Sequence, residues 1–110
     1  MSAARSALPR ALAELLVEAE RDRDKAASES ASSGASRYES DILSRAAYEQ
    51  RLRRGLESLA DNGAPLSFGE RLPHHYWFRA HDRRSTSTSS LAGAIRNWIA
   101  AATKAEGRAT

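Results

Sequence analysis

Large hydrophobic residues are scarce in this chain. Leu, Ile, Val and Phe account for 17 of its 110 residues, and a short chain so poor in them can bury only a thin core. Such a composition is also found in disordered proteins, but these usually carry a large net charge, and the formal charge here is only +3. We therefore expect residues 1–110 to form one small domain that associates with a partner or with further copies of itself.

Cysteine is absent, which excludes disulfide bonds, zinc sites with thiolate ligands and a cysteine nucleophile. Long apolar runs are absent as well. The N-terminal stretch MSAARSALPRALAELLVEAE is interrupted by Arg10, Glu14 and Glu18, so it has the pattern of neither a signal peptide nor a membrane span. We expect no membrane association and a cytoplasmic location, or a location in the virion if the chain is a structural protein of a phage.

Lysine is nearly absent. The chain has 15 Arg and 2 Lys, together with 22 Ala, which is typical of a GC-rich coding sequence and favours a bacterial or phage source. Guanidinium groups make bidentate contacts to carboxylates and phosphates and stack on aromatic rings. Because 17 basic residues are balanced by 14 acidic ones, a strongly positive surface requires that the arginines cluster.

Three segments have the hydrophobic spacing of amphipathic helices. The first spans about residues 9–27, because Pro9 suits a first helical turn. The second spans about 36–61, where Asn62-Gly63 would stop the helix. The third spans about 91–105, with Ser89 or Ser90 as its N-terminal cap and Gly107 at its end.

A Ser-rich loop over residues 28–36 connects the first two helices, which predicts an antiparallel hairpin with Glu18 or Asp22 near Arg45. Residues 64–90 are predicted to be irregular, because Pro65, Gly69 and Pro73 interrupt them and Tyr76–Phe78 has no obvious strand partner. The fold class is therefore all-α: a helical hairpin, an irregular aromatic and basic segment, and a C-terminal helix.

The second helix carries a stripe at heptad-like spacing that mixes apolar and charged residues. Its charged members are Arg45 and Glu49. On a lone helix they would form a weak surface pair, whereas inside a helix interface they would fix the register. The other members are Tyr38, Ile42, Leu52, Leu56 and Leu59.

The run FGERLPHHYWFRAHDRR, residues 68–84, holds four of the seven aromatic residues, all three histidines and four arginines. Trp and Arg often carry the binding energy of interfaces, and aromatic rings stack on bases. The serines that follow lead into the third helix, whose N-terminal N–H groups could bind phosphate. The predicted binding residues are Tyr76, Trp77, Arg79, Arg83 and Arg84, with Arg51 and Arg54 on the second helix as weaker candidates.

Catalytic and metal-binding signatures are missing. The three histidines lack the helical His-x-x-x-His spacing, and neighbouring arginines would repel a cation, so we expect no metal. No nucleophile motif or glycine-rich phosphate loop occurs, so we expect neither enzymatic activity nor a cofactor. A purely structural interpretation also stays open, in which Tyr76–Phe78 fills the gap between helices and residues 85–90 form a solvated loop.

The sequence thus predicts a small, basic, non-enzymatic protein that binds nucleic acid or a nucleoprotein complex. The alternative is a structural, assembly or inhibitor protein of the phage type, which binds a larger protein partner or associates with itself. The arginines separate the two. If Arg51, Arg54, Arg79, Arg83 and Arg84 share one face, nucleic acid is favoured; if they are dispersed and Trp77 is exposed, a protein partner is favoured.

Overall fold

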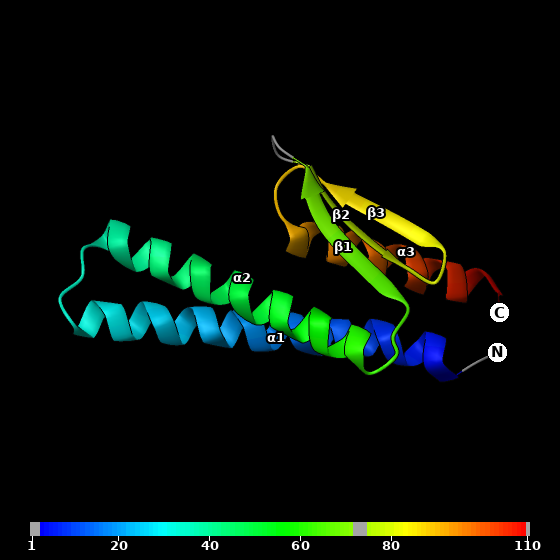
Figure 1. The fold of residues 1–110 in the computed structure, drawn as a ribbon, viewed down its shortest axis with the longest axis horizontal. Coiled ribbons are helices and arrows are strands. Elements are labelled where there is room, and N and C mark those ends of the chain that lie inside the picture. Colours follow the sequence, from blue (N-terminus) through cyan, green and yellow to red (C-terminus); the bar gives the residue numbers. More distant parts are fainter. Residues whose placement is uncertain (1–2, 72–74, 110) are drawn as a thin grey trace. The chain divides into compact units, whose positions relative to one another are not determined.

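The computed structural model describes residues 3–71 and 75–109, with the side chains of 7–71 and 75–104. Its elements are α1 (Ala3–Ser32), α2 (Arg37–Asp61), β1 (Leu66–Arg71), β2 (His75–Ala80), β3 (Arg83–Ser87) and α3 (Leu91–Ala109), as Figure 1 shows. They form two compact units: unit 1 combines Met1–Ala13 with Leu59–Thr110, and unit 2 is Glu14–Ser58. None of the described helices is long and apolar enough to cross a membrane.

The predicted all-α fold is wrong, because the segment expected to be irregular, residues 64–90, contains a three-stranded antiparallel sheet. Its strand order is β1-β2-β3, so β2 is the central strand. Phe68 on β1 lies opposite Phe78, and Phe78 lies opposite Ser85 on β3. The chain is still mostly helical.

The turns of this sheet explain why the strands were missed. β2 and β3 are joined by His81 and Asp82, which have φ values of 49° and 62°. A two-residue hairpin turn needs this left-handed backbone, but its usual sequence signal is Asn-Gly or Asp-Gly. Pro65 directly precedes β1 instead of interrupting a strand, and Pro73 lies outside the described residues.

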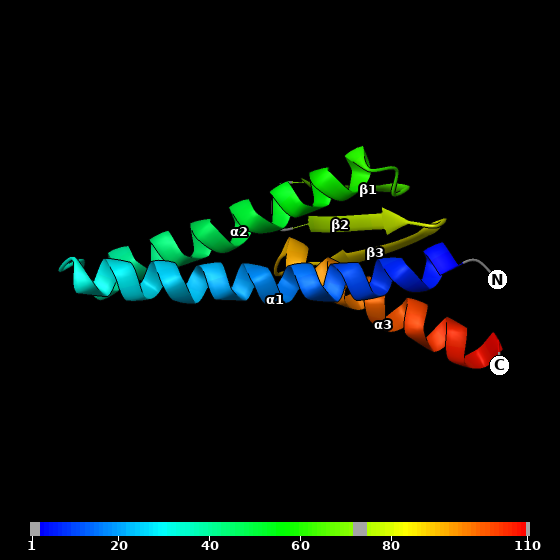
Figure 2. The same cartoon turned by 90° about the horizontal axis from the view of Figure 1, so that it is seen from below.

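In unit 1, α3 packs along one face of the sheet, which we call the inner face (Figures 1 and 2). Trp98 is only 2% exposed, and its ring meets Phe78 edge-on at 5.6 Å between centroids. Its indole Nε1 donates to the carbonyl oxygens of Ala80 and Arg83, at 3.1 and 3.2 Å. Trp98 therefore holds both strands that flank the β2–β3 turn. The buried apolar residues of unit 1 are Leu8, Leu12, Phe78, Ala80, Leu91, Ala92, Ala94, Ile95 and Trp98.

Unit 2 confirms the antiparallel hairpin. Ser40 Oγ on α2 donates to the Ala27 carbonyl on α1 at 3.3 Å, and Leu15 packs against Gly55. The predicted partner of Arg45 is wrong, since Arg45 pairs with Asp41 on its own helix at 3.1 Å. The Ser40–Ala27 and Arg51–Glu18 contacts place Arg45 level with residues 22–24 of α1, so Arg45 turns to a carboxylate of its own helix instead of reaching across the hairpin.

The first helix is longer than expected at both ends. α1 begins at Ala3, so Pro9 lies inside the helix rather than in its first turn. It also continues through residues 28–32, which were expected to be loop, and only residues 33–36 connect it to α2. Within this extension the Ser30 hydroxyl donates to the Ala26 carbonyl at 2.8 Å and lies 2.8 Å from Ser40 Oγ on α2.

The other helix ends were predicted better. Gly63, at φ 97°, donates to the Ala60 carbonyl at 3.0 Å, which confirms the stop after α2. Ser90 confirms the predicted cap of α3, since its Oγ accepts the Gly93 N–H at 3.0 Å. α3 does not end at Gly107, however, but continues to Ala109.

Candidate nucleic-acid interface

The sheet face opposite α3 is called here the basic face. Successive residues of a strand point to opposite sides, and residues directly opposite each other on antiparallel strands point to the same side. Since Phe78 and Ala80 point to α3, Trp77 and Arg79 point away from it. Arg84 lies opposite Arg79, and Gly69 lies opposite Trp77. By this register the basic face consists of Ser67, Gly69, Arg71, His75, Trp77, Arg79, Arg84 and Thr86.

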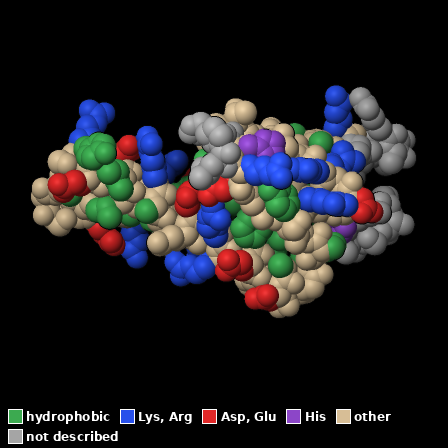
Figure 3. Space-filling view, turned by 45° about the horizontal axis from the view of Figure 1, so that its top comes forward, with side chains coloured by type: hydrophobic (Ala, Val, Ile, Leu, Met, Phe, Trp, Pro, Cys, Tyr) green, Lys and Arg blue, Asp and Glu red, His purple; other side chains and the backbone are tan. Residues whose placement is uncertain are grey.

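The charged side chains of the basic face are all positive. Arg71, Arg79 and Arg84 are all exposed, and none of its eight positions is Asp or Glu. In Figure 3, Lys and Arg side chains lie together beside a histidine over the part of the molecule that holds the sheet. A cluster of like charges raises the local concentration of anions even when the net charge is small. The face is therefore suited to a polyanion.

Trp77 lies at the centre of this face and is partly covered. Its indole crosses Gly69, where a Cβ would come within 3.0 Å of the indole Nε1. The guanidinium carbon of Arg84 lies over the same ring, 5.4 Å from its centroid. An aromatic ring over a strand glycine replaces the packing that the glycine lacks. The part of this arrangement that faces solvent is thus chiefly the Arg84 guanidinium group, which lies over the Trp77 indole.

Three predicted residues, Trp77, Arg79 and Arg84, are brought together on the basic face. Tyr76 and Arg83 belong to the inner side by the strand alternation, and Arg83 Nη1 donates to the Ala101 carbonyl on α3 at 3.0 Å. Arg83 therefore links the sheet to α3 rather than facing a ligand.

The two candidates on α2, Arg51 and Arg54, belong to unit 2. Arg51 Nη2 donates to Glu18 Oε2 at 2.9 Å. This hydrogen bond, with the negative charge of Asp22, raises the pKa of Arg51 above its ordinary value. Arg51 contributes to the hairpin contact, whereas Arg54 is exposed on α2.

The N-terminus of α3, predicted to bind phosphate, is occupied by the chain's own serines. Ser90 Oγ accepts the Gly93 N–H, and Ser87 Oγ accepts the Ser89 N–H at 3.1 Å. Ser87 also lies directly against Gly93, which places this helix end on the inner side of the sheet. It is therefore not part of the surface formed by Arg79 and Arg84.

Sequence reasoning missed Arg71, Ser67, Gly69 and Thr86. Only the alternation of residues along strands could have identified them, and β1 and β3 were not recognised as strands. Arg71 is two residues from Gly69, so it lies on the same side of β1 once the strand is known.

Two observations concern metal ligands and buried histidine in the part of the chain that the structure describes. There, no three His, Asp or Glu side chains are grouped as metal ligands. The buried Nε2 of His81 has no hydrogen-bond partner, and the ring lies 6.4 Å from that of Trp98. The basic face itself offers positive charge and N–H donors, which bind anions. No protein-family model, curated protein or solved structure matches this chain.

Proposed function

We propose that the protein binds double-stranded DNA through the basic face. The observation that carries the proposal is an exposed sheet surface on which Arg71, Arg79 and Arg84 surround Trp77 without any carboxylate. The axes of two neighbouring strands, such as β2 with Arg79 and β3 with Arg84, lie about 5 Å apart, and the major groove of B-DNA, about 12 Å wide, admits a two-stranded β-ribbon. A surface of this width can present its arginines both to phosphates and to base edges.

Duplex DNA suits this surface better than a single strand. Proteins that bind single strands stack bases on open aromatic faces. At Trp77 a base would have to displace Arg84, which already lies over the ring. Arginine donors, in contrast, match phosphate oxygens and the O6/N7 edge of guanine. The major groove of duplex RNA is too deep and narrow for such contacts.

A non-enzymatic role in the cytoplasm of a bacterial cell, or in a phage particle, belongs to the same proposal.

A protein partner is the second candidate function. The observation that favours it is that two of the five candidate arginines are engaged within the protein, since Arg51 donates to Glu18 and Arg83 donates to the Ala101 carbonyl. Such a partner would have to present an acidic surface to the basic face.

Fluorescence anisotropy with a labelled DNA duplex, at several salt concentrations, tests the proposal. Arg79→Ala and Arg84→Ala should each weaken binding by at least about 1 kcal/mol, which is roughly fivefold. Each should also reduce the slope of log K against log salt by about 0.9 if the arginine contacts a phosphate. Single-stranded DNA and duplex RNA of the same length should bind more weakly than duplex DNA.

Arg21→Ala is the matched control, because Arg21 is an exposed arginine of α1 in unit 2. It should leave the affinity unchanged. If Arg54→Ala weakened DNA binding as much as Arg79→Ala, the interface would include α2 as well as the basic face. Absence of duplex binding at low salt, or full affinity in the Arg79→Ala, Arg84→Ala double variant, would overturn the proposal.

A further inference from the structure

Arg79 and Arg84 are cross-strand neighbours, yet they occupy different parts of the basic face. They lie directly opposite each other in the register of β2 and β3, where like charges repel. Arg79 lines a pocket at the end of the sheet together with His81 and Asp82 of the β2–β3 turn. The Arg84 guanidinium instead reaches over Trp77 on the central strand. Arg84 is therefore directed toward the middle of the face, whereas Arg79 borders its end.

The strand register places a third arginine at the other end of the face. Arg71 lies opposite His75, which is four positions from Arg79 along β2. Arg71 and Arg79 are thus separated by about 13 Å along the strand direction. Trp77 is two positions from both His75 and Arg79, so it lies midway between the two ends. Because the Arg84 guanidinium lies over Trp77, the face has one guanidinium over its centre and one near each end.

The Trp77 indole restrains the central guanidinium. It lies so close to Gly69 that a Cβ there would come within 3.0 Å of the indole Nε1. The guanidinium carbon of Arg84 lies 5.4 Å from the ring centroid. None of the ion pairs among the described residues involves Arg84. Its N–H donors are therefore restricted in orientation and remain available to a ligand, which reduces the entropy lost on binding.

A restrained orientation matters more for a base than for a phosphate. Phosphate oxygens accept hydrogen bonds from many directions, so a flexible arginine or lysine can bind them. Guanine presents its O6 and N7 acceptors along one edge in the major groove, and an arginine has to meet both at once. Since the groove winds around the DNA axis, a straight β-ribbon lies closest to the base edges at its middle. Arg84 is at the middle of the face, and Arg71 and Arg79 are near its ends.

We propose that Arg84, held by Trp77, binds the O6 and N7 edge of guanine, whereas Arg71 and Arg79 bind phosphates. This base contact rests on the proposed binding of duplex DNA and adds a sequence preference to it. Trp77 is a positioning residue in this arrangement, because it acts through Arg84. The protein should therefore prefer duplexes that contain G·C pairs.

Fluorescence anisotropy of the full chain with three duplexes of equal length tests the base contact. The first contains G·C pairs, and the second contains only A·T pairs. The third has 7-deazaguanine in place of guanine, which removes the N7 acceptor and leaves the phosphates unchanged. The first should bind at least about fivefold more tightly than the others, as expected for a bidentate arginine contact. Arg84→Ala should bind all three alike, whereas Arg79→Ala, the matched control, should lose affinity but keep the preference.

The same preference tests the role of Trp77, because a merely structural defect would weaken binding to all three duplexes equally. Trp77→Leu should abolish the preference, and Trp77→Phe, which keeps an aromatic ring, should retain most of it. Gly69→Ala is a second variant, since its Cβ would displace the indole, and it should also reduce the preference. Arg84→Lys should abolish it, because an ammonium group does not make the bidentate contact.

The possible failures are distinguishable. Equal affinity for the three duplexes would overturn the guanine contact and leave the proposed function intact, since phosphate contacts alone would explain the binding. A guanine preference that survives Arg84→Ala would place the base contact on another residue. A preference that survives both Trp77→Leu and Gly69→Ala would overturn the positioning role of Trp77. Absence of binding to every duplex would contradict the proposed function itself.

Discussion

Arg83 and Arg84 are adjacent and chemically identical, yet the sheet gives them different roles. Arg83 reaches the Ala101 carbonyl on α3, while Arg84 lies over Trp77 on the opposite side. The difference arises only from the alternation of side chains along β3. In this adjacent pair, Arg83 therefore stabilises the fold and Arg84 belongs to the candidate DNA surface.

We expect Arg83→Ala to lower the free energy of unfolding by about 1.5 kcal/mol, because a charged donor to a carbonyl is lost. Arg84→Ala should lower it by only about 0.5 kcal/mol, the value of an exposed cation–π contact, but should weaken DNA binding. Urea denaturation followed by circular dichroism measures the first quantity, and anisotropy measures the second. The reverse pattern, in which Arg83→Ala costs affinity and leaves stability unchanged, would place Arg83 on the contact surface.

At the scale of elements, the close approach of α1 and α2 depends on a glycine. A Cβ added at Gly55 would overlap the side chain of Leu15, which is buried. Gly in a helix interior normally costs about 1 kcal/mol relative to Ala. Here the absence of a side chain allows Leu15 to pack against the backbone of α2, so the usual cost is offset by contact between the helices.

Gly55→Ala should therefore destabilise the protein, by about 1–3 kcal/mol, as an overpacked core does. In a Leu15→Ala background the same substitution should instead stabilise the protein by up to about 1 kcal/mol, because the obstructing side chain is gone. Thermal or urea denaturation of the four proteins of this cycle measures both effects. An increase in stability on Gly55→Ala alone would show that the helices are not in contact at this position.

The helices could be predicted from the sequence because their apolar residues recur at helical spacing. Leu52 and Leu56 lie on the predicted stripe of the second helix and are buried. The sheet could not be predicted in this way, because β3 has the sequence RRSTS and contains no apolar side chain. Its inner positions include Ser85 and Ser87, and Gly93 of α3 comes close to Ser87, so no hydrophobic alternation appears.

The candidate site could be predicted only in part for the same reason. Composition identified the window that contains Trp77, Arg79 and Arg84. Which of its arginines share a side depends on the strand register, and the register depends on pairing between segments that local patterns do not show. Arg71 was missed for this reason, and Arg83 was included although it contacts α3.

At the scale of the whole molecule, stability should be unevenly distributed. Unit 1 buries Phe78, Ile95 and Trp98, each at most 2% exposed. The outer half of the hairpin, residues 20–51, buries only two serines among its described side chains. Segments with few buried apolar contacts open locally at low free energy. Backbone amides between residues 20 and 51 should therefore exchange with solvent much faster than those of residues 91–101.

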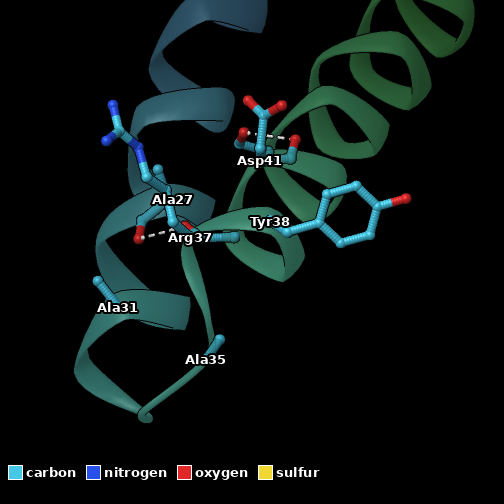
Figure 4. A pocket seen from close by; sticks show the side chains of 8 residues that line it. Ala27, Ala31, Ala35, Arg37, Tyr38 and Asp41 are labelled. Carbon is cyan, nitrogen blue, oxygen red and sulfur yellow. Dashed lines mark hydrogen bonds between the residues drawn. The ribbon is translucent and has the colours of Figure 1, made fainter.

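Amide hydrogen exchange of the full chain measures this distribution. Residues 91–101 should stay protected longest, because opening them exposes Ile95 and Trp98, which are buried. Equal protection in residues 20–51 and 91–101 would mean that the small-residue contact between α1 and α2, seen around Ala27 and Ala31 in Figure 4, is as stable as the core of unit 1.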